Sequence, residues 1–108
     1  MEGYFNTMKA MISQPMNNLT ADYILSRRQN AMNTLKNFGY DIEDTFFTSD
    51  NYISDDTKFF SVAYLAKSIE AMSKCDAVYF CKGWEEERGC KIEHEVAKNY
   101  GLSIIYEE

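Results

Sequence analysis

The strongest constraint on the fold is a regular alternation of short apolar runs with longer amphipathic segments. The apolar runs predict strands over residues 9–13, 40–43, 77–81 and 102–106. The segments between them predict helices over residues 19–38, 59–74 and 89–100. Strands that alternate with helices favour a parallel sheet covered on both faces. Because crossovers are right-handed, we expect a three-layer α/β sandwich of the flavodoxin-like or Rossmann-like type, with four or at most five parallel strands in the order 2-1-3-4.

Local signals predict the ends of these elements and their buried faces. Pro15 cannot donate to a sheet ladder, so the first strand should end before it. Asn17, Asn18 and Thr20 offer N-cap oxygens to the first helix, whose polar face should carry Arg27 and Arg28. The apolar spacing predicts buried faces made of Tyr23, Ile24, Ala31, Leu35 and Phe38 in the first helix, Phe59, Val62, Ala66, Ile69 and Met72 in the second, and Ile92, Val96 and Tyr100 in the third.

Length and composition exclude several classes of protein. The 108 residues, 45% of them hydrophobic, suffice for a single folded domain (1–108), in which residues 1–8 are expected as a loose arm. No apolar run is long enough to span a membrane, and no signal peptide is recognisable. The 17 acidic residues exceed the 11 Lys and Arg, and this net charge of −6 disfavours a nucleic-acid partner, since such binding depends on basic side chains.

The cysteine and histidine content indicates a cytoplasmic protein without a metal. Cys75, Cys81 and Cys90 are an odd, widely spaced set, typical of reduced thiols buried as small hydrophobes. Cys90 could instead be a more acidic, reactive thiol, because a position at a helix start can lower the pKa of a thiol. With one histidine and no CxxC pair, no zinc site is expected, and the glycines match no phosphate-binding motif, so no cofactor is expected either.

The expected topology itself nominates a ligand site. In doubly wound sheets, ligands bind beyond the carboxyl ends of the strands where the strand order reverses, here between the first and third strands. Two loops meet there, residues 14–17 and 82–88. Ser13 and Gln14 offer hydrogen-bonding groups at this edge, although such residues are also common in turns.

Glu93 is the leading candidate for a catalytic residue. It lies near the start of the third helix, on the flank of the predicted apolar stripe, and should face the strand ends. The helix macrodipole would keep its carboxylate ionised, as a nucleophile requires. The alternative is a carboxylate at a helix start without any chemistry. His94 and Glu95 are expected on other faces of the helix.

The loop before the third helix adds two further candidates. Trp84, next to Gly83, would stack on a nucleobase or act as a lid, or else seal the edge of the core or a subunit interface. Glu87 ends a run of three glutamates, which is ordinarily a solvated run. It also precedes Glu93 closely enough to point into the same pocket.

Several stretches carry a family resemblance. They are residues 12–16 (Ile-Ser-Gln-Pro-Met), residues 74–78 (Lys-Cys-Asp-Ala-Val), the pattern Gly89-x-x-x-Glu93-x-x-x-Ala97, and residues 101–105 (Gly-Leu-Ser-Ile-Ile). On these residues the chain resembles the nucleoside 2-deoxyribosyltransferase superfamily, and in particular its short, mostly uncharacterised members from phages and bacteria. The resemblance runs through nearly the whole chain.

The resemblance implies a covalent reaction on a nucleoside or nucleotide. Glu93 matches the family's nucleophile, which attacks the anomeric carbon and expels the base before another base or water takes the glycosyl group. Commonly, a residue from a neighbouring subunit completes such sites. Substrate-binding positions are then expected at Ser13, Gln14, Pro15, Met16, Ser68, Gly83, Trp84, Glu87 and Gly89.

Two positions depart from the family pattern. Ser68 stands where the transferases carry an aspartate that protonates the leaving base, and a serine cannot act as a general acid of matched pKa. Glu87 stands where nucleoside transferases carry an aspartate that meets the 5′-hydroxyl and where related monophosphate hydrolases carry a serine. A glutamate would repel a phosphate, which favours a neutral nucleoside.

Three functional hypotheses stay open. The first is an N-glycosidic-bond enzyme, either a deoxyribosyltransferase or a nucleoside hydrolase, with Glu93 as nucleophile. The second is a non-catalytic protein that binds or sequesters a nucleotide or nucleoside-derived ligand in the same crevice. The third is an interaction protein whose Trp84 loop is an interface. A homo-oligomer, a dimer or higher, is expected under all three, because a small domain of this kind exposes sheet edges and apolar surface.

Overall fold

The computed structural model describes residues 7–45 and 54–108 of the chain. Its elements are β1 (Met8–Ser13), α1 (Ala21–Asn37), β2 (Tyr40–Ile42), α2 (Phe60–Met72), β3 (Ala77–Phe80), the 3₁₀ turn η2 (Trp84–Glu86), α3 (Arg88–Tyr100) and β4 (Ser103–Tyr106). The strands form one four-stranded parallel sheet in the order β2-β1-β3-β4. The predicted α/β class, parallel pairing and strand order are therefore confirmed.

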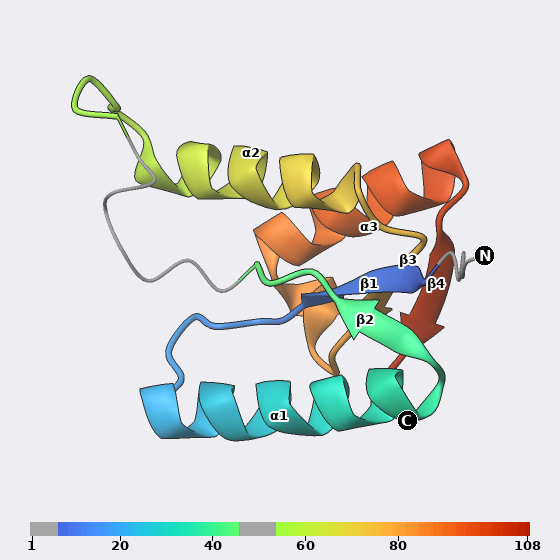
Figure 1. Ribbon diagram of the computed structural model, residues 1–108. Helices are drawn as coiled ribbons and strands as arrows, with labels where there is room; N and C mark the ends of the chain where they lie inside the picture. Colours follow the sequence, from blue (N-terminus) through green and yellow to red (C-terminus); the bar gives the residue numbers. More distant parts are fainter. Residues whose placement is uncertain (1–6, 46–53) are drawn as a thin grey trace.

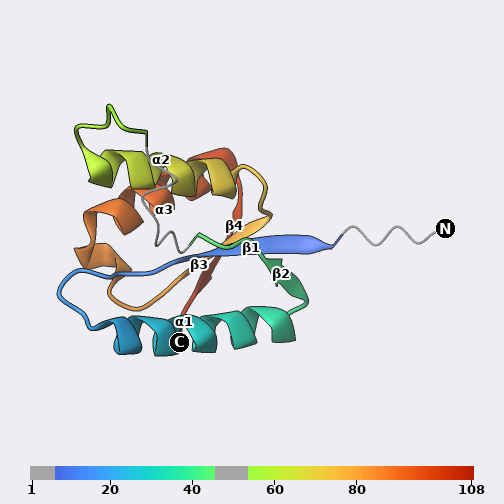
Figure 2. The same cartoon turned by 60° about the vertical axis from the view of Figure 1, so that its left-hand side comes forward.

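Helices cover the two faces of the sheet unequally. Figures 1 and 2 show α1 on one face, and α2 and α3 together on the other. Because side chains alternate along a strand, β1 contributes to two separate cores. Ala10 and Ile12 pack with the α1 residues Ala31 and Leu35. Met11 belongs to the opposite core, with Met72 of α2 and Ala97 of α3.

The predicted element boundaries hold to within a few residues. Thr20 is the N-cap of α1, where its hydroxyl accepts a hydrogen bond from the Tyr23 backbone N–H at 3.1 Å. The predicted arm, residues 1–8, extends one residue too far, because Met8 already belongs to β1. The Ser-, Asp- and Asn-rich composition of residues 48–57 also predicts a loop before α2. Residues 1–6 of the arm and residues 48–53 of this loop lie outside the described residues.

The predicted buried faces of α1 and α2 are only partly right. On α1, Tyr23 and Phe38 are exposed, whereas Arg28, expected on the polar face, is buried and pairs with Asp44 at 3.1 Å. On α2, Met72 is buried, but Phe59, directly before the helix, is 74% exposed and Val62 is also exposed. The first turns of α2 therefore extend beyond the sheet, as Figure 1 shows, and leave their apolar side chains uncovered.

The buried face of α3 is displaced by one residue from the predicted stripe. Cys90, Glu93 and Ala97 are buried, while Ile92 is exposed and Tyr100 is 80% exposed. Glu93 thus lies in the middle of the face that packs on the sheet, and not on its flank. In the part of the chain that the structure describes, no helix has the length and apolar character to cross a membrane.

Candidate functional site

Ser13, the last residue of β1, and Gln14, which follows it, point to opposite faces of the sheet. Ser13 follows Met11 toward α2 and α3, where its Oγ donates a hydrogen bond of 2.5 Å to Oε1 of Glu93. Gln14 follows Ile12 toward α1, where its Nε2 donates to the Ile24 carbonyl at 2.7 Å. The strand alternation therefore divides the predicted crevice into two sites.

Glu93 is held at the floor of the first site. It is 8% exposed, and its partner Ser13 is 1% exposed. Since α3 begins at Arg88, Glu93 lies in the second turn of the helix, deeper than the helix start expected from sequence. A buried carboxylate with a hydroxyl donor is satisfied as an acceptor but separated from bulk water.

Burial determines the protonation behaviour of Glu93. Loss of hydration raises the pKa of its carboxyl, and hydrogen bonds from the Ser13 and Ser68 hydroxyls counteract this only in part. The helix macrodipole was expected to stabilise this carboxylate as an anion, whereas burial shifts its pKa in the opposite direction. Burial makes the carboxylate form less stable here than it is in water, which is a condition that favours reaction with an electrophile or uptake of a proton.

A cleft of about 1270 Å³, here called the Glu93 cleft, lies between the N-terminal halves of α2 and α3. Its lining includes six of the predicted site residues, namely Gln14, Met16, Ser68, Glu87, Gly89 and Glu93. Charged side chains at its wall are Lys58, Glu86, Glu87 and Arg88, in addition to Glu93. Apolar surface comes from Met16, Phe59, Phe60, Val62, Leu65 and Ile92.

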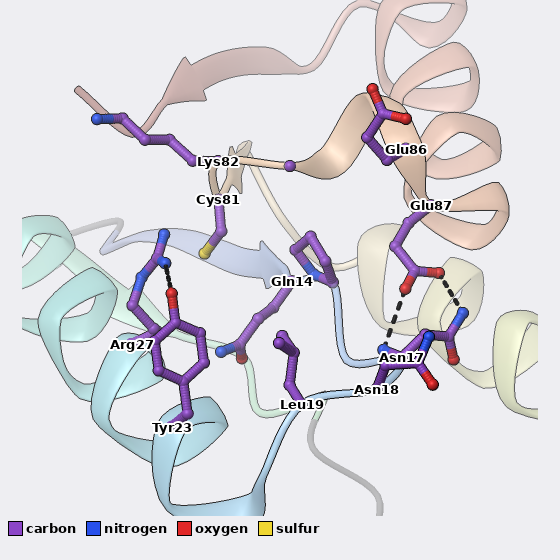
Figure 3. Close-up of a pocket in the computed structure, with 12 residues that line it drawn as sticks. Gln14, Asn17, Asn18, Leu19, Tyr23, Arg27, Cys81, Lys82, Glu86 and Glu87 are labelled. Atoms are coloured by element: carbon purple, nitrogen blue, oxygen red, sulfur yellow. Dashed lines mark hydrogen bonds between the residues drawn. The ribbon is translucent and has the colours of Figure 1, made fainter.

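Glu87 lies at the cleft but is already engaged by the β1–α1 loop. Its two carboxylate oxygens accept hydrogen bonds from the Asn17 side-chain amide at 2.9 Å and from the Asn17 backbone N–H at 3.1 Å. This pair joins the loop after β1 to the start of α3 (Figure 3). A hydroxyl of a ligand would have to displace Asn17 or share these oxygens with it.

The second site, here called the α1-side cleft, has a volume of about 470 Å³ and is shown in Figure 3. It receives the predicted residues Pro15 and Gly83, and it shares Gln14 and Glu87 with the Glu93 cleft. Gly83 has φ = 93°, a conformation that suits glycine at the turn into η2, and a Cβ there would lie 3.5 Å from Pro15 Cγ. Two predicted binding residues therefore face away from Glu93.

Trp84 is not brought together with Glu93. Its ring stacks on the imidazole of His94, with centroids 4.1 Å apart and planes at 19°, and packs against Phe80 at 5.4 Å. His94 Nε2 also lies 2.7 Å from the Tyr106 hydroxyl. Of the alternatives for Trp84, the structure supports the closing of a core edge. His94, expected on another face of the helix from Glu93, is half-buried in this cluster.

The cysteines are free thiols, as expected, but Cys90 is not activated. Burial raises its pKa to about 12, because loss of hydration outweighs the hydrogen bond with Ser13, and the nearby Glu93 charge adds to the increase. Its position in the first turn of α3 does not compensate for burial. A nucleophilic role for this thiol is therefore not supported.

Several lining residues carry no signal in the sequence. Thr45 is buried beside the Glu93 cleft, where its hydroxyl donates to the Ile12 carbonyl at 3.3 Å, and Tyr64 of α2 also lines this cleft. Tyr23 and Arg27 line the α1-side cleft, and only their spacing of one helical turn hinted at a pair. Within the described ranges, no cluster of three or more His, Cys, Asp or Glu side chains is placed to hold a metal ion.

Comparisons with known proteins give a family but no activity. No curated protein and no solved structure has significant similarity to this chain. A family model covers all the strands and helices of the sheet fold, including both clefts. The chain belongs to the DUF4406 family, a domain of unknown function, whose model matches residues 8–106.

Proposed function

We propose that the protein cleaves or transfers the N-glycosidic bond of a nucleoside, with Glu93 as the nucleophile. The observation that carries this proposal is the buried Glu93 carboxylate at the floor of a large cleft, held by Ser13 at 2.5 Å. A fixed, partly desolvated carboxylate is the group that retaining glycosyl transfer requires. The family resemblance of the sequence points to the same residue.

The chemistry is consistent with the burial of Glu93. An oxygen of its carboxylate would attack C1′ of the sugar, forming a C1′–O bond while the C1′–N bond breaks and its electron pair leaves with the base. The charge of the carboxylate disappears as the ester forms, so the step relieves the cost of keeping an anion out of water. Water or a second base then attacks C1′ and restores the carboxylate.

The cleft favours an uncharged substrate. Its charged side chains are Lys58 and Arg88 against Glu86, Glu87 and Glu93, which leaves an excess of negative charge. A phosphate close to Glu87 would be repelled, whereas sugar hydroxyls can donate to a carboxylate. The apolar wall formed by α2 suits a base or a deoxyribose ring. We therefore favour a nucleoside over a nucleotide.

The residues that match the family's proton donor and hydroxyl-binding position, Ser68 and Glu87, are not suited to protonate the leaving base, and this favours an alternative function. Ser68 lines the cleft in place of a general acid, and both oxygens of Glu87 are engaged by Asn17. Among the described residues, Ser13 and Ser68 are the side chains that donate to Glu93, and a cleft built on one such buried carboxylate is also suited to holding a nucleotide or a nucleoside-derived ligand intact. Binding or sequestration without turnover is therefore the second candidate function.

We also propose that the protein works as a homo-oligomer in the cytoplasm. Phe59, Phe60 and Val62 leave large apolar surfaces exposed where α2 extends past the sheet, at the mouth of the Glu93 cleft. Exposed apolar surface of this kind is typical of a subunit contact. Light scattering of the full chain tests this, and a monomer at working concentrations would contradict it.

Base release measures the proposed activity directly. The full chain is incubated with each 2′-deoxynucleoside, with and without a free acceptor base, and products are separated chromatographically. The wild type should release base, and Glu93→Gln, which keeps the size and hydrogen-bonding capacity of the side chain, should reduce the rate by at least about a hundredfold. Equal rates in the two proteins would reject Glu93 as nucleophile.

The same samples separate the two candidate functions. Calorimetry with Glu93→Gln reports whether an intact nucleoside or nucleotide binds. Tight binding without product over hours, in the wild type as well, would favour sequestration. Absence of binding and of turnover for every nucleoside and nucleotide would remove both candidates.

A further inference from the structure

Cys90 and Glu93 share the buried face of α3, and both meet the same side chain of β1. Cys90 is 5% exposed and Glu93 is 8% exposed. Residues three positions apart on a helix are neighbours on its surface, so the two side chains lie next to each other. Ser13 contacts both, since its Oγ lies 2.5 Å from Glu93 Oε1 and it forms a side-chain hydrogen bond with Cys90. The reaction proposed at Glu93 leaves this thiol without a role.

The direction of the two hydrogen bonds at Ser13 follows from the number of protons available. A serine hydroxyl carries one proton and two lone pairs. Ionised Glu93 is an acceptor only, so the proton of Ser13 lies in the bond to Oε1. Toward Cys90 the Ser13 oxygen then offers lone pairs, and the thiol S–H is the donor. The contacts therefore form a relay in which Cys90 donates to Ser13 and Ser13 donates to Glu93.

The environment of Cys90 keeps the thiol in the protonated form that the relay requires. Burial raises its pKa to about 12, and the negative charge of Glu93 adds to the increase. Near neutral pH the sulfur therefore carries its proton. Donation by a thiol has a second example in this protein, since Cys75 Sγ donates to the Ala71 carbonyl at 3.4 Å.

A donor to the Ser13 oxygen strengthens the bond that Ser13 makes to Glu93. Hydrogen bonds in series polarise one another, so a hydroxyl that accepts one bond is a better donor of the next. This effect is larger where water is excluded, and Ser13 is 1% exposed. The thiol also occupies a lone pair of Ser13 and so restricts rotation of the hydroxyl. Both effects favour a carboxylate that is stabilised as an anion and held in one orientation.

We propose that Cys90 is a positioning residue for Glu93 that acts through Ser13, by donating its S–H to the Ser13 hydroxyl. The thiol forms no bond to the substrate and stays protonated throughout. Its contribution is to direct the Ser13 proton at Glu93 Oε1. The meaning of this contribution for catalysis rests on the function proposed for Glu93, whereas the relay itself does not.

A carbon-13 titration of the Glu93 carboxyl in the full chain tests the relay without any substrate. Cys90→Ala removes the donor and should raise the pKa of Glu93 by about 0.2–0.5, whereas Cys90→Ser keeps a donor and should hold this pKa within about 0.1 of the wild type or lower it. A purely space-filling role predicts the opposite sign for Cys90→Ala, because a smaller side chain would admit water and lower the pKa. Cys81→Ala is the matched control, since it removes a buried thiol from the α1 side of the sheet and should leave the pKa of Glu93 unchanged.

A double variant shows whether the effect passes through Ser13. In Ser13→Ala the relay is already broken, so the addition of Cys90→Ala should change the pKa of Glu93 by less than about 0.1. The inference is overturned if Cys90→Ala alone lowers this pKa or leaves it unchanged. It is also overturned if Cys90→Ser shifts the pKa as far as Cys90→Ala does, or if the full shift persists in the Ser13→Ala background.

The pH profile of base release adds the catalytic readout. In Cys90→Ala the acid limb of the kcat/KM profile should move up by the same amount as the pKa of Glu93, which lowers kcat/KM about two- to threefold on that limb, and Cys90→Ser should restore it. A profile that does not move with the pKa would overturn the role of Cys90 in catalysis. If the wild type has no turnover, the function proposed for Glu93 fails, while the titration still decides the relay.

Discussion

Removal of the Ser13 hydroxyl should change both the stability of the protein and the acidity of Glu93. Ser13 is 1% exposed and donates to Glu93 Oε1 at 2.5 Å, so Ser13→Ala leaves a buried acceptor without this donor. A hydrogen bond to a charged group is worth about 1.5–3 kcal/mol, and one between neutral groups about 0.5–1.5 kcal/mol. The loss of stability should therefore be larger when Glu93 is ionised.

The sign of the pH dependence follows from the pKa of Glu93. Its folded-state pKa is raised, so its contribution to stability is fully present below the ordinary glutamate pKa and is lost as the pH rises through the folded-state pKa. Ser13 lowers that pKa by stabilising the carboxylate. In Ser13→Ala the pKa of Glu93 should rise further, and the decline in stability with rising pH should become steeper.

Denaturant unfolding at a series of pH values measures this effect. Between about pH 4 and about pH 8, the destabilisation caused by Ser13→Ala should grow by about 1 kcal/mol. A carbon-13 titration of the Glu93 carboxyl gives the pKa directly in both proteins. Ser68→Ala is the matched control, and since the Ser68 hydroxyl is the smaller influence on Glu93, its effect should have the same sign and a smaller size. A pKa of Glu93 that falls, or a destabilisation that shrinks with rising pH, would refute this reasoning.

Three further predictions concern the buried groups. Glu93→Gln should raise the free energy of unfolding near neutral pH by about 0.5–2 kcal/mol, because it removes a buried carboxylate, and an unfolding series that shows a loss would contradict this. Because burial raises the pKa of Cys90 to about 12 and that of Cys81 to about 11, both thiols should react with iodoacetamide much more slowly in the folded than in the unfolded chain, as mass spectrometry can follow. His94→Ala should cost about 0.5–1.5 kcal/mol and shift the emission of Trp84, the single tryptophan, to longer wavelength, and unchanged emission would show that the stacked pair does not persist in solution.

The order of helices and strands was predictable because the apolar residues are spaced differently in the two kinds of element. Runs such as Ala77–Phe80 are buried on both sides of the sheet and read as continuous apolar strands, while the helices between them show helical spacing. Once strands alternate with helices, right-handed crossovers leave few topologies. The observed order β2-β1-β3-β4 is one of these.

The buried face of α3 was missed because burial there does not follow hydrophobicity. Cys90 and Ala97 are small, and Glu93 is charged, yet these are the side chains that face the sheet. The larger apolar residues Ile92 and Tyr100 point outward. A buried face predicted from the most hydrophobic positions is therefore displaced by one residue from the observed one. That displacement placed Glu93 on the flank of the predicted face.

The division of the crevice into two clefts was also beyond sequence reasoning. Ser13 and Gln14 are adjacent, and only the helices that face them decide which one meets Glu93 and which one meets α1. The pairing of Asn17 with Glu87 joins residues 70 positions apart, and no local pattern signals it. The stack of Trp84 on His94 is likewise a tertiary contact, so a tryptophan expected at the ligand lies elsewhere.

Mass spectrometry of the intact protein after incubation with 2′-deoxynucleosides tests the central proposal most directly. If Glu93 is the nucleophile, a brief incubation followed by acid quenching should yield protein carrying one 2-deoxyribosyl group, and peptide mapping should locate this group on Glu93. Glu93→Gln should carry none under the same conditions. An adduct on another residue, or base release by the wild type that persists in Glu93→Gln, would contradict the account.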